Sequence, residues 1–194
     1  MNADDSAWVT IDLPCPLDQT RRLAEDPQRL LRLNPYLELR LWQTIGPDHW
    51  RAGLFNETNG LTLATEVRRQ PENHGYSLEW DRGIKRRTRV EWQSAGTSSR
   101  LVLRDVYLLT ETADSHALAA VDRSINAWGI AIRRHVLALQ RWQWLPGYRA
   151  LREGFWLGLS PRQRRISRLI VWVSVLEFVT VLFILAIWWN ESTR

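Results

Sequence analysis

Apolar and polar residues alternate with a period of two in a series of short segments between Trp8 and Thr110. Such alternation is typical of β-strands that bury one face. It predicts seven strands, at residues 8–13, 36–44, 50–56, 61–69, 75–81, 88–93 and 100–110. Turn residues separate the last six and no helical pattern interrupts them. We therefore expect an antiparallel meander that the first strand joins at an edge.

Helical periodicity occurs in three further segments. Residues 17–25 and 27–33 predict two short helices, the second with Asp26 as its N-cap and Pro27 in its first turn. The longest helical pattern runs from Ser115 to Trp144. Its apolar seam repeats at steps of three and four, which predicts a helix lying along the concave face of the sheet. The seam consists of Leu118, Val121, Ile125, Trp128, Ile132, His135, Leu139 and Trp142.

This order of elements resembles the START-like helix-grip superfamily, also called SRPBCC, which includes the birch-pollen-allergen fold, polyketide cyclases and coenzyme-Q-binding proteins. The resemblance covers about residues 7–145 and is carried by WVTIDLPCPLDQTRRLAEDPQRLLRLNPYL, SAGTSSRLVLRDVYLL and DRSINAWGIAIRRHVLALQRW. It implies an α+β fold in which a curved antiparallel sheet of about seven strands grips the long helix. It also implies a cavity between helix and sheet that holds an apolar molecule in most members. The superfamily shares no catalytic signature, so the resemblance assigns no reaction.

The interior of such a fold would be rich in large flat side chains, because the chain has 12 tryptophans. Aromatic side chains line apolar ligand pockets with few polar contacts. We expect a cavity lined by Trp80, Trp92, Leu103, Asp105, Tyr107, Trp128, Ile132 and His135. The alternative is that the tryptophans fill the interior and leave no room for a ligand.

Asp105 shares one face of the last strand with Leu101, Leu103 and Tyr107. If that face is inward, the carboxylate is buried and needs a partner, such as an arginine on an adjacent strand or His135. If the opposite face is inward, Asp105 is solvated. An inward Asp105 beside Tyr107 would also suit cyclase-type proton transfer. Because no second catalytic group accompanies it, we assign no catalytic residue and favour a protein that is not an enzyme.

Other chemistry finds little support in the sequence. The single Cys15 excludes an internal disulfide, and four scattered histidines leave too few ligands for a structural metal site. Residues 81–89 form a cationic run that we interpret as a solvated hairpin turn; the alternative is contact with lipid headgroups or with the acidic face of a partner. The run lacks the glycine pattern of a nucleotide site. We therefore expect no metal and no cofactor.

Residues 169–189 read LIVWVSVLEFVTVLFILAIWW, with Glu177 as the only ionisable side chain. At about 1.5 Å rise per residue, a helix of this length crosses a hydrocarbon core of about 30 Å. Trp172, Trp188 and Trp189 lie near its ends, where tryptophans favour the headgroup level. This segment is a candidate transmembrane helix.

The flanks of the apolar segment predict its orientation. Four arginines precede it and place the preceding domain in the cytoplasm by the positive-inside rule; they are Arg162, Arg164, Arg165 and Arg168. The acidic N-terminus has no apolar signal-peptide core. We expect a tail-anchored, single-pass protein of the inner (cytoplasmic) membrane.

Between the domain and the apolar segment lies a basic stretch with aromatic residues at helical spacing, typical of a helix in the membrane interface. Its expected lipid-contacting residues are Arg149, Arg152, Phe155 and Trp156, followed by the four arginines. The predicted organisation is a helix-grip domain at 1–145, an interfacial linker at 146–168, a transmembrane helix at 169–189 and a short tail at 190–194.

Charge is distributed unevenly along the chain. All 26 basic residues except Lys85 are arginines, and ten of them lie between Arg123 and Arg168, where Glu153 is the only acid. Such a block suits nucleic acid or an anionic membrane. Beside an apolar segment, membrane lipid is the simpler partner, and we expect no nucleic acid.

Glu177 lies near the middle of the apolar segment with Ser174 and Thr180 three residues to either side. These three residues form a polar stripe that suits packing against a transmembrane helix of another protein. The alternative is a protonated Glu177 tolerated by a very apolar helix.

Two functional hypotheses follow. The first is a START-like protein that binds an apolar or amphipathic ligand, such as a lipid, quinone or polyketide-like molecule, at the cytoplasmic face of a membrane. The second is an accessory or assembly subunit of a membrane protein complex, with a packed adaptor domain that docks through its transmembrane helix.

Overall fold

The computed structural model describes residues 6–107 and 115–192, which divide into two compact units, Met1–Gly158 and Leu159–Arg194. The first unit contains seven strands: β1 (Ser6–Leu13), β2 (Leu37–Gly46), β3 (His49–Asn56), β4 (Leu61–Glu72), β5 (Gly75–Trp80), β6 (Lys85–Ala95) and β7 (Ser98–Tyr107). Its helices are α1 (Leu17–Ala24), α2 (Pro27–Arg32), α3 (Ser115–Arg141), α4 (Tyr148–Ala150) and the π-helix η1 (Leu151–Trp156). The last three residues of the predicted strand 100–110 lie outside the described residues.

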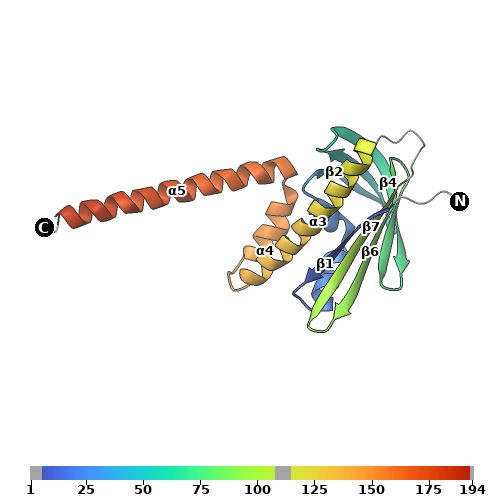
Figure 1. Ribbon diagram of the computed structural model, residues 1–194, viewed down its shortest axis with the longest axis horizontal. Coiled ribbons are helices and arrows are strands. Elements are labelled where there is room, and N and C mark those ends of the chain that lie inside the picture. The colour runs from blue at the N-terminus through green and yellow to red at the C-terminus, as the bar shows by residue number, and fades with distance from the viewer. Residues whose placement is uncertain (1–5, 108–114, 193–194) are drawn as a thin grey trace. The chain divides into compact units, whose positions relative to one another are not determined.

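The seven strands form one antiparallel sheet in the order β1-β7-β6-β5-β4-β3-β2. Six strands follow one another as a meander, and β1 pairs with β7 at the edge, with Ile11 opposite Leu101. Figure 1 shows the long helix α3 running along the sheet. The predicted helix-grip architecture is confirmed.

The face of the sheet that points inward follows from the strand register and burial. Along β7, Leu101, Leu103, Asp105 and Tyr107 are buried and alternate with more exposed residues. Leu103 pairs with Val90 of β6 in the register of the sheet, and Val90 is fully buried. Asp105 is therefore on the inner face, which decides between the two orientations that the sequence left open.

Helix α3 approaches β1 closely because a glycine lies at the contact. A Cβ atom on Gly129 would lie 2.8 Å from Cγ2 of Val9. Glycine lets the helix and the strand pack this tightly, and any larger side chain would push them apart. Trp128, beside it on α3, is 1% exposed and points into the core.

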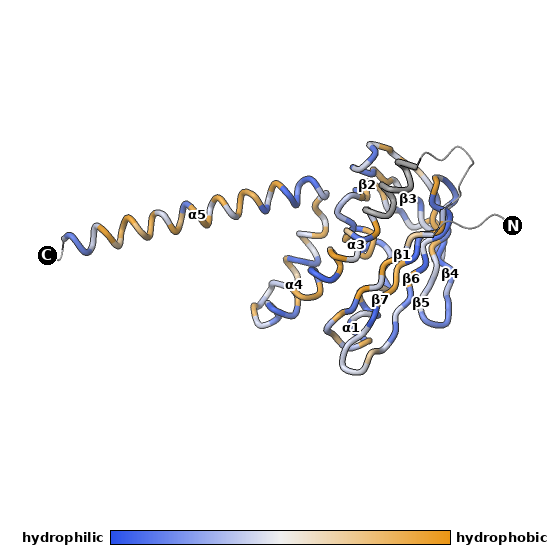
Figure 2. Tube along the Cα trace, in the orientation of Figure 1, coloured by the Kyte–Doolittle hydropathy of each residue, from blue (hydrophilic) through white to orange (hydrophobic). Residues whose placement is uncertain are grey.

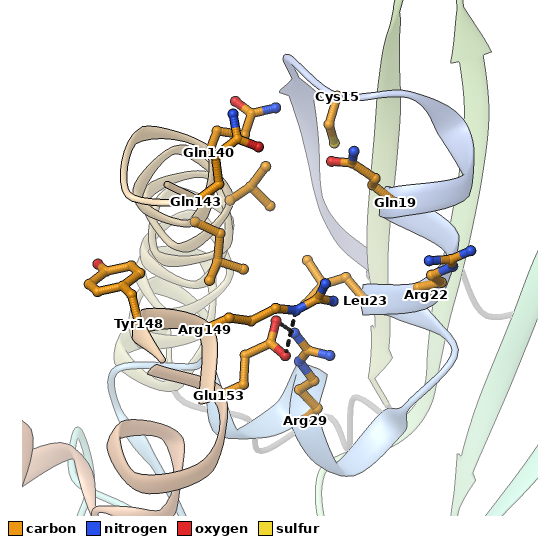
Figure 3. A pocket seen from close by; sticks show the side chains of 12 residues that line it. Cys15, Gln19, Arg22, Leu23, Arg29, Gln140, Gln143, Tyr148, Arg149 and Glu153 are labelled. Carbon is orange, nitrogen blue, oxygen red and sulfur yellow. Dashed lines mark hydrogen bonds and ion pairs between the residues drawn. The ribbon is translucent and has the colours of Figure 1, made fainter. Parts of the chain in front are cut away.

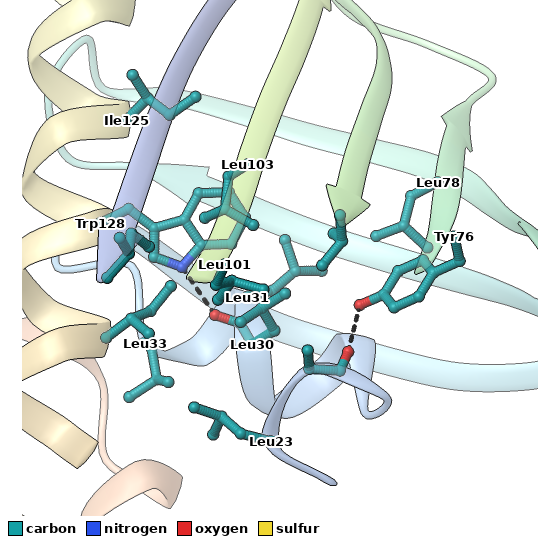
Figure 4. Close-up of a cluster of buried hydrophobic side chains, with 14 of the residues drawn as sticks. Leu23, Leu30, Leu31, Leu33, Tyr76, Leu78, Leu101, Leu103, Ile125 and Trp128 are labelled. Atoms are coloured by element: carbon teal, nitrogen blue, oxygen red, sulfur yellow. Dashed lines mark hydrogen bonds between the residues drawn. The ribbon is translucent and has the colours of Figure 1, made fainter. Parts of the chain in front are cut away.

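Helices α1 and α2 close one end of the inner face through hydrogen bonds to their carbonyl groups (Figure 4). Trp128 Nε1 donates to Leu30 O at 2.9 Å, and the Tyr76 hydroxyl donates to Ala24 O at 2.7 Å. Asp26 caps α2 by accepting from the Arg29 N–H, as expected from the sequence. Burial raises the pKa of Tyr76 above its ordinary value, because the charged form would lose its hydration.

The second unit contains α5 (Pro161–Ser192), the one helix among the described residues that is long and apolar enough to cross a membrane. None of the apolar window of this helix is buried within the protein. Figure 2 shows hydrophobic residues along most of α5, with hydrophilic residues at both of its ends.

Candidate functional site

Lys85, the only lysine of the chain, points to the inner face because of a β-bulge. In the pairing of β6 with β7, Lys85 lies opposite Tyr107 while Arg87 lies opposite Val106, so Arg86 is the extra residue. A bulge of this kind re-aims the neighbouring side chain. Thr88 and Val90 are buried on the inner face of the sheet, and in a regular strand every second residue points to the same face. Without the bulge, Arg86 would therefore point to the inner face, whereas it is exposed.

The ammonium group of Lys85 lies 2.6 Å from Asp105 Oδ2. The Asp105 side chain is 4% exposed and that of Lys85 is 26% exposed, so the pair lies at the margin between core and solvent. The carboxylate also accepts a hydrogen bond from Thr88 at 2.6 Å and one from Tyr107 at 3.2 Å. We call Lys85, Thr88, Asp105 and Tyr107 the Lys85 centre.

Two tryptophans flank the Lys85 centre. The Lys85 ammonium lies 5.8 Å from the ring centroid of Trp80 and 5.9 Å from that of Trp128, within the range of cation–π attraction. Trp80 Nε1 also donates to Thr88 Oγ1 at 3.1 Å, and the Thr88 hydroxyl in turn donates to Asp105. This chain of donors compensates the carboxylate for the water it loses on burial.

The predicted cavity residues are all buried or half-buried, and the apolar ones belong to or pack against one hydrophobic core, but only some of them reach the Lys85 centre. Trp80, Asp105, Tyr107 and Trp128 meet at the Lys85 centre. Trp92 instead packs edge-on against Tyr76, with ring centroids 6.0 Å apart. The remaining three, Leu103, Ile132 and His135, are buried in the core.

Lys85 and Thr88 are not among the predicted cavity residues. The sequence pattern predicts a solvated turn at residues 81–89 and a strand that begins at Thr88, whereas β6 begins at Lys85. That interpretation is wrong for Lys85, whose charge is paired with Asp105 rather than solvated in a turn. The one available signal was composition, since a single lysine stands among 25 arginines.

A concave pocket of about 300 Å³ lies elsewhere in the first unit, between α1 and α2 on one side and the end of α3 with α4 and η1 on the other (Figure 3). Its apolar wall contains Leu23, Val136 and Leu139. The other lining residues are Cys15, Gln19, Arg22, Arg29, Gln140, Gln143, Tyr148, Arg149 and Glu153.

The predicted lipid-contacting residues lie in both units. In the first unit, Arg149 is exposed and donates to Glu153 at 3.2 Å, and Arg152 donates to the Tyr148 hydroxyl at 3.3 Å. Phe155 is 63% exposed, and Trp156 is half-buried. Residues 148–158 are helical without a break, with the π-helix η1 following directly on the short α4, and Leu157 is buried in the core.

In the second unit, Arg162, Arg165 and Arg168 are exposed, and Arg164 donates to the Leu159 carbonyl at 3.0 Å. These arginines lie in the first turns of α5. Their contact with lipid stays a prediction.

The polar stripe of α5 is exposed along the helix. The Thr180 hydroxyl donates to the Leu176 carbonyl at 2.9 Å, so its hydrogen-bonding capacity is partly used within the helix itself. Ser174 and Glu177 are exposed. If α5 spans a bilayer, Glu177 is the ionisable side chain that would lie near the middle of the span.

No protein-family model matches the chain, and no curated protein matches it in sequence. Solved structures do match a large part of the chain. A START superfamily protein from Mycobacterium smegmatis aligns with a TM-score of 0.55 at 14% identity, over 69% of this chain and 98% of that one. A conserved protein from Geobacillus kaustophilus aligns with a TM-score of 0.53 at 13% identity, over 70% and 97%.

A protein from Thermus thermophilus aligns with a TM-score of 0.51 at 19% identity, over 69% of this chain and 98% of that one. Each of these structures is covered almost completely, while about a third of the present chain has no counterpart in it. The fold of the first unit is START-like.

Proposed function

We propose that this protein binds an apolar or amphipathic ligand in its START-like unit and is held at a membrane by α5. The ligand would contact the apolar inner face of the sheet and direct its polar end to the Lys85 centre. The span would leave the START-like unit on the cytoplasmic side, because the arginines that precede the apolar segment favour that side.

The observation that carries the ligand proposal is the Lys85 centre. Small-molecule sites combine apolar walls with a few fixed polar groups that orient the ligand. Lys85 offers an ammonium held by Asp105 and flanked by two tryptophan rings, on a side chain that keeps some exposure. An ammonium has three donors, and Asp105 uses one of them, so a ligand oxygen has donors available.

The membrane part of the proposal is supported by the exposure of α5. The protein itself covers none of the apolar window of this helix. Exposing so much apolar surface to water is unfavourable, so we expect another apolar medium to cover α5. The length of the helix suits a bilayer.

The proposal is tested by measuring which small apolar molecules co-purify with the full-length protein in mild detergent. The extract is analysed by mass spectrometry and expressed per mole of protein for the wild type and for Lys85→Met. Loss of a charge-assisted hydrogen bond should lower the retained ligand about tenfold or more. Arg86→Met is the matched control, because Arg86 is the exposed neighbour on the same bulge, and it should retain the wild-type amount.

Asp105→Asn provides a second variant that keeps the size of the buried side chain. It frees Lys85 from its ion pair and should change the ligand affinity while the domain remains folded by circular dichroism. A wild-type protein that carries no small molecule, or equal retention in all variants, would overturn the proposal.

A second candidate function is an accessory subunit of a membrane complex. The packing of Trp80 and Trp128 favours it, because other side chains of the protein cover both rings almost completely. In that case the docking surface would be the stripe around Glu177 on α5. Glu177→Leu should then abolish co-purification of a membrane protein while the START-like unit keeps its fold, and unchanged co-purification would argue against this surface.

A further inference from the structure

Two arginines from separate segments converge on one carboxylate in the pocket between α1–α2 and α4–η1. Arg29 of α2 forms an ion pair with Glu153 of η1, and both side chains are 20% exposed. Arg149 of α4 donates from Nε to the second oxygen of Glu153 at 3.2 Å. Figure 3 shows Arg29, Arg149 and Glu153 pointing toward one another. The Glu153 carboxylate is thus held by two guanidinium groups in the way that a bound oxyanion would be.

The pocket has more positive charge than Glu153 can balance. Arg22, Arg29 and Arg149 all line it, and Glu153 is its only acidic lining residue. Among the described residues Arg22 has no hydrogen-bond or ion-pair partner. The Nε atom of Arg29 is buried and has no acceptor within the described structure. The Arg22 guanidinium and the Arg29 Nε therefore have no acceptor among the described protein groups.

The remaining walls of the pocket limit the kind of molecule that fits. Leu23, Val136 and Leu139 supply an apolar side, and three glutamine side chains supply amide groups. A volume of about 300 Å³ is at the lower end for small-molecule sites. The pocket suits a small anion or the charged end of an amphipathic molecule with a short apolar portion.

The π-helix is a second unusual feature at this place. Helices of this kind are rare and are frequently found at functional sites. Glu153 lies within η1, so the carboxylate that contacts the two arginines is carried by a π-helix.

We propose that this pocket is a binding site for an oxyanion, phosphate or carboxylate, and that Glu153 is its internal competitor. The anion would accept hydrogen bonds from Arg22 and Arg29 and displace the Glu153 carboxylate. This site is distinct from the Lys85 centre, and the inference does not depend on the ligand proposed for the interior. The same chemistry fits a free phosphate compound or the headgroup of an anionic lipid.

The test measures binding to the full-length protein in a maltoside detergent, which carries no phosphate. Titration calorimetry with inorganic phosphate reports the anion alone, and titration with a short-chain phosphatidate reports the anion with an apolar tail. Tighter binding of the phosphatidate identifies a lipid headgroup as the source. Equal affinity for the two probes identifies a free anion, and both results support an oxyanion site.

Three variants should change the affinity for the anion probes, one raising it and two lowering it. Glu153→Gln removes the competing carboxylate and should raise the affinity about tenfold. Arg29→Gln should lower it at least tenfold. Arg22→Gln should also lower it, and this variant breaks no bond between described side chains, so it tests binding without a folding defect. Arg21→Gln is the matched control on α1, because Arg21 pairs with Glu25 and does not line the pocket; its affinity should be unchanged.

A purely structural ion pair gives a different pattern. In that case Glu153→Gln and Arg29→Gln would both lower thermal stability, and neither probe would bind to the wild type or to Glu153→Gln. Absence of binding to Glu153→Gln, or a loss of affinity in that variant, overturns the proposal.

Discussion

The two units of this protein use similar apolar residues in opposite ways. In the START-like unit, Trp128 is 1% exposed and Leu103 is fully buried. In α5, Trp172 is 69% exposed and Phe183 is 65% exposed. The first unit supplies its own apolar environment by closing a sheet around a helix, whereas α5 needs one from outside. The START-like unit thus buries its large apolar side chains within itself, whereas α5 leaves them on its surface, as the proposed membrane anchor requires.

The largest expected effect follows from placing charge on the exposed apolar surface of α5. The double variant Phe178→Arg/Leu182→Arg adds about 2.5–3.5 kcal/mol per arginine to the cost of insertion near the helix centre. The wild-type protein should resist extraction of membranes with alkaline carbonate, and the double variant should be released. Phe178→Leu/Leu182→Ile is the matched control and should stay in the membrane. Release of the wild type would show that α5 does not span a bilayer.

The next largest effect concerns a buried ring of the first unit. Trp128→Ala should lower the free energy of unfolding by about 3–5 kcal/mol, because it leaves a cavity and removes the donor to Leu30 O. Urea unfolding of the full-length protein in detergent, followed by circular dichroism, measures this change. Trp8→Ala removes the same side chain from a site that is 60% exposed and should cost less than about 1 kcal/mol. Similar losses in both variants would mean that the inner face is not the core.

Much of the fold could be predicted from the sequence because its signals are local and periodic. The alternation in β7 and the apolar seam of α3 each repeat over many residues, and a single misplaced residue does not hide them. The side chains of Leu118 and Val121, at the start of that seam, lie outside the described residues. Strand ends were less predictable, as β4 continues through Pro71 to Glu72, where a turn was expected.

The candidate site was harder to predict because it depends on a departure from periodicity. One extra residue at Arg86 brings Lys85 to the inner face, and nothing in the alternation marks such a bulge. The pocket around Glu153 joins residues more than a hundred positions apart, from α2 and η1. No local pattern predicts contacts of this kind.

A moderate loss of stability is expected when the ion pair between Lys85 and Asp105, at the edge of the core, is removed. Asp105→Asn should destabilise the protein by about 1–3 kcal/mol, because the carboxylate accepts three buried or half-buried donors. Glu79→Gln is the matched control on β5, which is separated from β7 by β6. Glu79 pairs with Arg87 on the surface, and its loss should change stability by less than about 1 kcal/mol. Equal effects would show that the Lys85 centre behaves as a surface ion pair.

The smallest expected effect concerns Tyr76 and the pH dependence of the free energy of unfolding. Burial raises the pKa of Tyr76 in the folded protein above the ordinary value of 10.0. The stability linked to this group is therefore fully present below about pH 10 and is lost as the pH rises from there toward the folded-state pKa. The loss has a limiting slope of about 1.4 kcal/mol per pH unit.

Tyr76→Phe removes this titration together with the hydrogen bond to Ala24. The variant should be less stable than the wild type by about 1 kcal/mol at pH 7, and the difference should shrink or reverse at pH 11. Urea unfolding at the two pH values measures both differences. A constant difference would show that the Tyr76 hydroxyl titrates equally in the folded and unfolded states.

The most direct test of the account is native mass spectrometry of the full-length protein, released from its own membrane in a mild detergent. If the START-like unit encloses a ligand and α5 inserts, the protein is found in the membrane fraction and retains a small apolar or amphipathic molecule. A protein that carries no small molecule and instead retains another membrane protein would contradict the ligand-binding function and favour the accessory-subunit alternative.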